Sequence, residues 1–193
     1  MSTNKRLKAN VQKQVTAMFA LVFLAIYVST QALAYSTVGA VSVKGVEQEK
    51  KYWCWAATAE CILDYFGIST TQESFVSLVK GITPAPNVTA LDSEVYDGLY
   101  DYGLTGTIRA ASISFSSTAS EIYNERPIYA GISWSSGGGH AVVICGYDSD
   151  SKMIEYMEPD DGTFHQMLYS KFKGGSSSSR DWDGTIYGLR LRK

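Results

Sequence analysis

The chain has 193 residues, of which 45% are hydrophobic and 19% charged, with a formal net charge of −2. Its 13 Tyr, seven Phe and four Trp supply enough apolar surface for a packed core, which excludes a disordered chain, and its length suits one domain. The slightly acidic balance argues against nucleic acid as a partner, because phosphate binding requires a basic face.

Residues 1–34 have the pattern of a secretory signal peptide. A basic start without acidic residues precedes an apolar run of 12 residues over 17–28, and Ala32-Leu33-Ala34 follows. That run is shorter than the roughly 20 residues that span a bilayer, and an uncleaved anchor is the alternative. We therefore expect a secreted protein without stable membrane association after cleavage. We also expect a monomer. Residues 35–193 would form a single domain with a formal charge of about −6, since the leader holds four of the 17 basic residues and none of the 19 acidic ones.

The segment 48–66 is predicted to hold a buried helix with a thiol at its start. Ala57, Cys61 and Tyr65 are spaced by four and form a stripe continuous with Cys54, and Gly67 follows as a stop signal. Cys54 would lie in the first turn, where the helix dipole and unpaired N–H groups favour a thiolate. The alternative is a small buried hydrophobic residue, as most free cysteines are.

The rest of the first half reads as mainly helical. Capping-box spacing occurs at Thr70 and Glu73, and again at Thr118 and Glu121. A loose extended segment is expected over 35–45 and a short strand within 105–115. The predicted helices cover residues 70–80, 89–102 and 118–126.

The second half consists of short runs with strand composition, separated by turn residues. These runs predict an antiparallel sheet, and the loop 174–179 is expected to be flexible. Helices followed by strands indicate an α+β domain, with the Cys-bearing helical part packed on one side of the sheet. The predicted strands cover residues 128–134, 140–147, 153–158, 163–168 and 185–191.

Three cysteines in a secreted protein leave at least one outside any intrachain disulfide, and Cys54 is our candidate. Cys145 lies five residues after His140 on the same predicted strand, and an odd offset places two side chains on opposite faces. If His140 faces the Cys54 helix, Cys145 faces away. We therefore expect Cys61 and Cys145 to be buried thiols rather than a disulfide.

A thiolate nucleophile needs an imidazole close in space and a third group that orients it. Of the two histidines, His140 follows three glycines at the start of an apolar strand, whereas His165 has no comparable setting. An ordinary strand-end histidine is the alternative. The acids after the next strand are candidates for the third group, although each also suits a solvated turn: Glu158, Asp160 and Asp161.

Gln48 completes the candidate set. It lies six residues before Cys54, and its side-chain amide together with the Cys54 backbone N–H could donate to a developing oxyanion. A surface glutamine without such a role is the alternative.

These motifs together resemble the bacterial papain-like cysteine peptidases, in particular the leader-peptidase-like branch and the effector proteases of plant-pathogenic bacteria. The resemblance covers residues 46–161. The segments that carry it are Gln48, Trp53-Cys54-Trp55-Ala56-Ala57, Arg126-Pro127-Ile128, Gly139-His140-Ala141-Val142-Val143-Ile144 and the acid before Pro159.

The resemblance implies a papain-like fold and a peptidase that acts on a protein or peptide. Cys54 would be the nucleophile, His140 the general acid and base, and Gln48 the oxyanion donor. The branch usually carries Asp before the proline, where this chain has Glu158, and Asp160 is the alternative third member.

Neither a metal nor a cofactor is expected, because the histidines and cysteines show no zinc-ligand spacing. Two other functions remain open at this point. One is a different thiol acyltransferase or amidase of the same fold, since a fold does not define its substrate. The other is a non-catalytic binding or toxin-like domain on the same scaffold.

Overall fold

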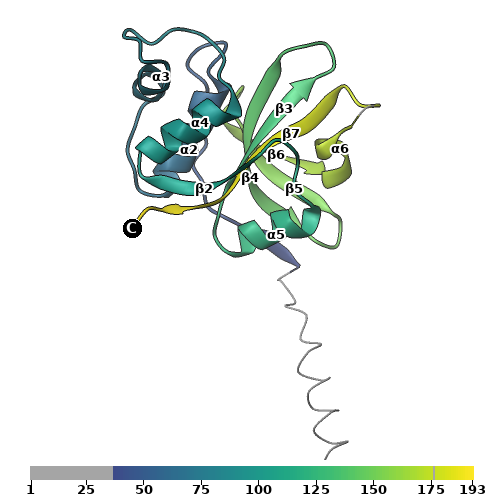
Figure 1. Cartoon of the computed structure of the whole chain (residues 1–193). Helices are drawn as coiled ribbons and strands as arrows, with labels where there is room; N and C mark the ends of the chain where they lie inside the picture. Colours follow the sequence, from purple (N-terminus) through teal and green to yellow (C-terminus); the bar gives the residue numbers. More distant parts are fainter. Residues whose placement is uncertain (1–36, 176) are drawn as a thin grey trace, which may run out of the picture. The chain divides into compact units, whose positions relative to one another are not determined.

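The structure is a computed structural model that describes residues 37–175 and 177–193 (Figure 1). The predicted signal peptide lies outside these residues. Within them, no helix combines the length and the apolar character needed to cross a membrane.

Seven antiparallel strands form one sheet in the order β2-β7-β3-β4-β5-β6, with β1 paired to β4. β3 and β1 pair with successive parts of β4. β3 pairs with β4 up to Ile144, and β1 pairs with it from Gly146. The predicted antiparallel sheet is therefore confirmed. The strands are β1 (Val38–Ala40), β2 (Leu104–Arg109), β3 (Ile128–Trp134), β4 (Gly139–Asp148), β5 (Met153–Glu158), β6 (Thr163–Leu168) and β7 (Arg180–Leu191).

Three of the helices, α2, α3 and α4, lie together on one side of the strands, whereas α5 and α6 lie apart from them (Figure 1). This arrangement confirms the predicted α+β class, with a helical part packed against the sheet. The short α6 was not expected from the sequence. The helices are α2 (Cys54–Tyr65), α3 (Gln72–Lys80), α4 (Asp92–Asp101), α5 (Phe115–Tyr123) and α6 (Tyr169–Lys173).

The predicted helix caps are displaced, by one residue for α3 and by four residues for α5. The residue that caps α3 is Thr71, whose hydroxyl accepts a hydrogen bond from the Ser74 N–H at 3.2 Å. Ser114 caps α5, and Thr118 lies inside that helix, where its hydroxyl donates to the Ser114 carbonyl at 3.1 Å. Threonine and serine side chains bond to the backbone both at caps and within a first turn, so spacing alone did not identify the cap.

Two further boundaries differ from the sequence prediction. α4 begins at Asp92 rather than at Thr89, whereas α2 begins at Cys54, as predicted. β7 begins at Arg180 because its first residues pair with the end of β3, where Arg180 lies opposite Trp134. That pairing is non-local, and the local composition does not reveal it.

Helix α2 packs directly on β4, which brings its first turn to the sheet. Ala56 and Ala59 are fully buried, and small side chains allow the helix to approach the strand closely. The buried Thr58 hydroxyl donates to the Ala141 carbonyl at 3.2 Å. This contact anchors α2 to β4 one residue after His140.

The two core cysteines are free, as predicted. Cys61 and Cys145 are 0% and 1% exposed. Burial raises the pKa of both thiols, that of Cys145 to about 12, so neither is a reactive thiolate near neutral pH. The pairing of β4 with β5 shifts register between Ile144 and Gly146, so the strict alternation assumed for Cys145 does not hold there.

Candidate active site

Cys54 is held at the first position of α2 by the two tryptophans beside it. The indole N–H of Trp53 donates to the Pro86 carbonyl at 2.9 Å, and that of Trp55 donates to the Val88 carbonyl at 3.0 Å. Both side chains are buried, whereas Cys54 is only half-buried. The thiol is therefore accessible on a rigid helix start.

His140 is the second residue of β4 and follows a tight hairpin. Gly137 and Gly138 turn the chain with φ angles of 88° and 86°, which residues other than glycine rarely adopt. Opposite His140 on β3 lies Ile132. The glycine run thus returns the strand so that the imidazole lies at the end of the sheet next to α2.

Glu158 ends β5, and its carboxylate hydrogen-bonds Nε2 of His140. The backbone N–H of Asp160 donates to the same carboxylate oxygen at 3.2 Å, which fixes its orientation. The side chains of His140 and Glu158 are 10% and 18% exposed. A mostly buried carboxylate that contacts an imidazole can hold one ring tautomer and stabilise the imidazolium.

The environment of His140 favours its charged form. Burial opposes the charge and by itself lowers the pKa of His140. Interactions with Cys54 and with the Glu158 carboxylate outweigh burial and raise this pKa from 6.5 to about 10. His140 therefore carries a proton at neutral pH.

Asp160 and Asp161 take other positions. Asp160 is exposed and contributes its backbone N–H rather than its carboxylate to the Glu158 contact. The Asp161 carboxylate lies 2.9 Å from Nε2 of His165, and both of these side chains are more than 40% exposed. This second His–Asp pair is a solvated turn contact without a thiol.

Gln48 lies in the loop before α2, beside the turn that follows Glu158. Its backbone N–H donates to the Pro159 carbonyl at 2.8 Å. Its side-chain nitrogen donates to the carbonyls of Lys50 and Lys51 at 3.2 and 3.0 Å. Its side-chain oxygen is buried without a hydrogen-bond partner among the described residues.

Trp134 is a site residue that the sequence reasoning missed. Its ring stacks on the His140 ring with centroids 6.4 Å apart and an interplanar angle of 27°, and the Arg180 guanidinium lies 5.5 Å from the Trp134 ring centroid. The Trp134 ring therefore lies beside the imidazole, roughly parallel to it. The sequence signal that could have identified Trp134 is its position at the end of the strand before the glycine hairpin.

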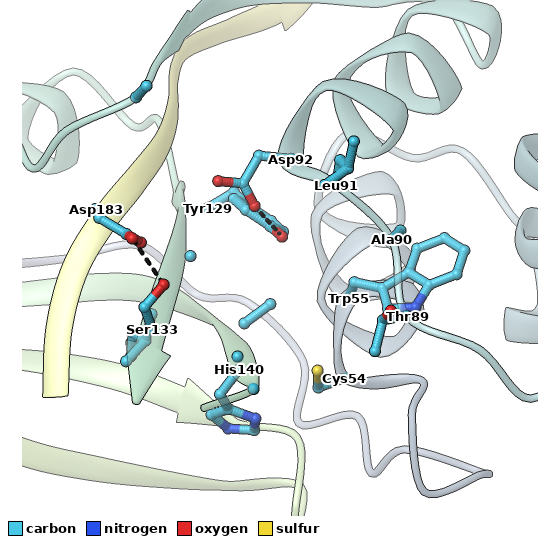
Figure 2. Close-up of a pocket in the computed structure, with 16 residues that line it drawn as sticks. Cys54, Trp55, Thr89, Ala90, Leu91, Asp92, Tyr129, Ser133, His140 and Asp183 are labelled. Atoms are coloured by element: carbon cyan, nitrogen blue, oxygen red, sulfur yellow. Dashed lines mark hydrogen bonds between the residues drawn. The ribbon is translucent and has the colours of Figure 1, made fainter. Parts of the chain in front are cut away.

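A cavity of about 490 Å³ opens beside the thiol and the imidazole. Cys54 and His140 line it, and so do Asp92, Tyr129 and Asp183, none of which the sequence reasoning identified (Figure 2). A peptide segment that enters this cavity would lie against the Cys54 thiol.

One group of side chains in the described part of the chain has the spacing of a cation site. The donor atoms of His140, Glu158 and Asp160 lie within 4.8 Å of one another. The His140 nitrogen and the Glu158 carboxylate already bond each other, so a cation would compete with that contact. The donor set therefore suits an imidazole–carboxylate pair better than a resident metal.

A thiol, an imidazole and a carboxylate in this order are the groups of nucleophilic acyl transfer. The thiolate attacks a carbonyl, the imidazolium protonates the leaving group, and the carboxylate orients the ring.

Solved structures share this fold. A double glycine motif protease from an AMS/PCAT transporter, solved with its leader peptide, matches with a TM-score of 0.54 and 17% identity over 77% of this chain and 93% of that one. The peptidase domain of Streptococcus ComA matches with a TM-score of 0.57 and 17% identity over 78% and 98%. Xylellain, a cysteine protease from Xylella fastidiosa, matches with a TM-score of 0.52 and 11% identity over 80% and 87%. No curated protein sequence matches this chain significantly.

The sequence itself matches a protein family over residues 37–175, which include Cys54, His140 and Glu158. That family is described as papain-like cysteine protease AvrRpt2. The chain is therefore a cysteine-type peptidase that belongs to the papain-like AvrRpt2 family.

Proposed function

We propose that this chain is a secreted, monomeric peptidase that hydrolyses peptide bonds with Cys54 as nucleophile, His140 as general acid and base, and Glu158 as the orienting carboxylate. One observation carries the proposal: the His140 imidazole hydrogen-bonds the Glu158 carboxylate and lines the same open cavity as the Cys54 thiol.

In the first half of the reaction, the Cys54 thiolate attacks the carbonyl carbon of the scissile bond, and the carbonyl oxygen becomes an oxyanion. The Cys54 backbone N–H in the first turn of α2 donates to that oxyanion. Gln48 is the second donor, and its amide must turn away from the Lys50 and Lys51 carbonyls to reach it. The His140 imidazolium then protonates the leaving amine, and an acyl-enzyme forms on the Cys54 sulfur.

In the second half, water attacks the acyl carbon and gives a proton to His140. The C–S bond breaks, and the thiolate and imidazolium are regenerated. Glu158 remains ionised throughout and holds the ring in place.

Two further parts of the proposal rest on separate support. A peptide substrate is supported by the double glycine motif protease, which was solved with its leader peptide. Export is supported by the leader pattern of residues 1–34, with cleavage after Ala34. The N-terminal sequence of the protein recovered from the medium of an expressing bacterium tests this cleavage.

Incubation of the full chain with a mixture of unstructured peptides tests the proposed chemistry. We expect new peptide termini and a transient acyl-enzyme whose added mass maps to Cys54, both detected by mass spectrometry. The matched controls are Cys54→Ala, which should give neither signal, and Cys61→Ala, which removes a buried thiol and should keep the adduct. New termini that persist in the Cys54→Ala protein would contradict the proposal.

The raised pKa of His140 predicts an alkaline limit to activity near pH 10 rather than 6.5. The imidazolium must protonate the leaving amine, so kcat/KM should decline as pH rises through about 10. Since folding raises this pKa, the stabilisation is complete below pH 6.5 and is lost as pH rises through about 10. Profiles of kcat/KM and of denaturant midpoint against pH check both statements. In Glu158→Gln the limit should move to lower pH, and an unchanged limit would refute the assignment.

A further inference from the structure

Two carboxylates line the cavity beside Cys54 and have no part in the proposed chemistry. Asp92 is the first residue of α4, and Asp183 lies on β7 (Figure 2). Among the described residues that line this cavity, none is a lysine or an arginine. The wall opposite the thiol and imidazole is therefore negatively charged.

The packing around the Asp92 carboxylate fixes its place. The hydroxyl of Tyr129, a side chain only 2% exposed, donates to it at 2.9 Å. The carboxylate lies over Gly131 and Gly184, which pair directly across β3 and β7. A Cβ atom would lie 2.8 Å from the Asp92 carboxylate at Gly131 and 1.6 Å from it at Gly184. Only glycine at these positions leaves room for the Asp92 side chain.

Asp183 is exposed at the other side of the same opening. The Ser133 hydroxyl donates to one of its carboxylate oxygens at 2.7 Å, and no hydrogen bond to the other oxygen is seen among the described residues. Burial raises the pKa of Asp92, the Tyr129 hydrogen bond lowers it, and the negative charge of Asp183 raises it further. The two carboxylates therefore repel each other, and a cation bound between them would relieve that repulsion.

Tyr129, which donates to Asp92, lines the same cavity as Cys54. Burial and the Asp92 carboxylate raise the pKa of Tyr129, and the charge of Cys54 raises it as well. The Asp92–Tyr129 contact is thus within electrostatic reach of the nucleophile.

We propose that Asp92 and Asp183 form a subsite that binds a basic side chain, lysine or arginine, of the peptide substrate next to the scissile bond. The inference rests on the proposed function, because it takes the cavity as the substrate site. Two carboxylates in a cavity whose described lining holds no lysine or arginine can bind a protonated amine or guanidinium by charge-assisted hydrogen bonds. A free N-terminal amine has the same chemistry, so the test must separate the two.

The first test compares peptides that differ only at one position near the scissile bond. With the full chain, we expect kcat/KM for lysine to exceed that for norleucine by at least about tenfold at one position. In Asp92→Asn and in Asp183→Asn this ratio should fall toward one, whereas Asp97→Asn, an exposed acid on α4 outside the cavity, should keep it. N-terminal acetylation should not change the ratio. A ratio lost on acetylation, or unchanged in both cavity variants, would overturn the proposal.

The second test does not depend on peptide hydrolysis. Aminoethyl and sulfonatoethyl methanethiosulfonate, a cation and an anion, both form a mixed disulfide with a thiolate and release methanesulfinate. Cys61 and Cys145 are buried, so both reagents report on Cys54. The cation-to-anion rate ratio should fall about three- to tenfold in Asp183→Asn and Asp92→Asn and stay constant in Asp97→Asn.

The two tests together distinguish the subsite from the enzyme. If the chain hydrolyses no peptide but its cation-to-anion rate ratio falls in the Asp92 and Asp183 variants, the cation subsite is supported and the proposed function is wrong. Hydrolysis without any lysine preference, or equal reagent ratios in wild type and both cavity variants, overturns the subsite alone. Asp183 is exposed, so its variant should fold even if Asp92→Asn does not.

Discussion

Replacing His140 with alanine is expected to lower kcat/KM for peptide hydrolysis by a factor on the order of 10⁴ to 10⁶. The imidazole lines the same cavity as the Cys54 thiol and is the proposed donor of a proton to the leaving amine, so both attack and departure lose their catalyst. A continuous assay with an internally quenched peptide measures the loss.

Two comparisons make this result specific. His165→Ala removes the other histidine, which is 42% exposed and bonds Asp161, and should leave kcat/KM within about threefold. The double variant Cys54→Ala/His140→Ala should be no slower than either single variant, because the two groups act as a unit. Retention of a tenth or more of wild-type activity by His140→Ala would exclude the imidazole as general acid and base.

Glu158→Gln is expected to reduce kcat/KM by about 10² to 10⁴ while the protein remains folded. An amide can hydrogen-bond the ring from either of its atoms, so it no longer imposes one tautomer, and it does not stabilise the imidazolium. Because Glu158 contacts His140 directly, the loss should appear mainly in kcat rather than in KM. Steady-state kinetics with one peptide separates the two parameters.

Asp160→Asn is the matched control for that variant. Asp160 is exposed and touches Glu158 through its backbone N–H, which the substitution keeps, so kcat/KM should stay within about threefold. Circular dichroism and thermal unfolding verify that both proteins fold. A large loss in Asp160→Asn together with a small loss in Glu158→Gln would make Asp160 the orienting carboxylate.

Much of the fold could be predicted because its signals are local. The strands 128–134 and 153–158 were bounded correctly by period and turn residues, and the α+β class follows from helices that precede strands. Element starts were less accurate. β7 was placed too late because Arg180 belongs to the strand through its pairing with Trp134, a partner 46 positions away in the chain.

The candidate site also has residues that local sequence identifies and residues that it does not. Cys54 and His140 stand in recognisable local settings, a small-residue helix start and a strand behind a glycine run. Whether Glu158 or Asp160 orients His140 depends on the turn after β5, which directs the Glu158 carboxylate toward the imidazole. Sequence spacing does not encode that direction.

By itself, the sequence determined the periodicities, the thiol and histidine settings and the strand-rich second half, since each depends on neighbours within a few residues. Only the tertiary structure decided which side chains share the cavity. Asp92, Tyr129 and Asp183 come from α4, β3 and β7 and meet there because Gly131 and Gly184 pair across the sheet and leave room for a carboxylate. Trp134 lies beside His140 for a similar reason, because the hairpin returns β4 against β3. Such contacts depend on register and packing between distant segments, which no local pattern specifies.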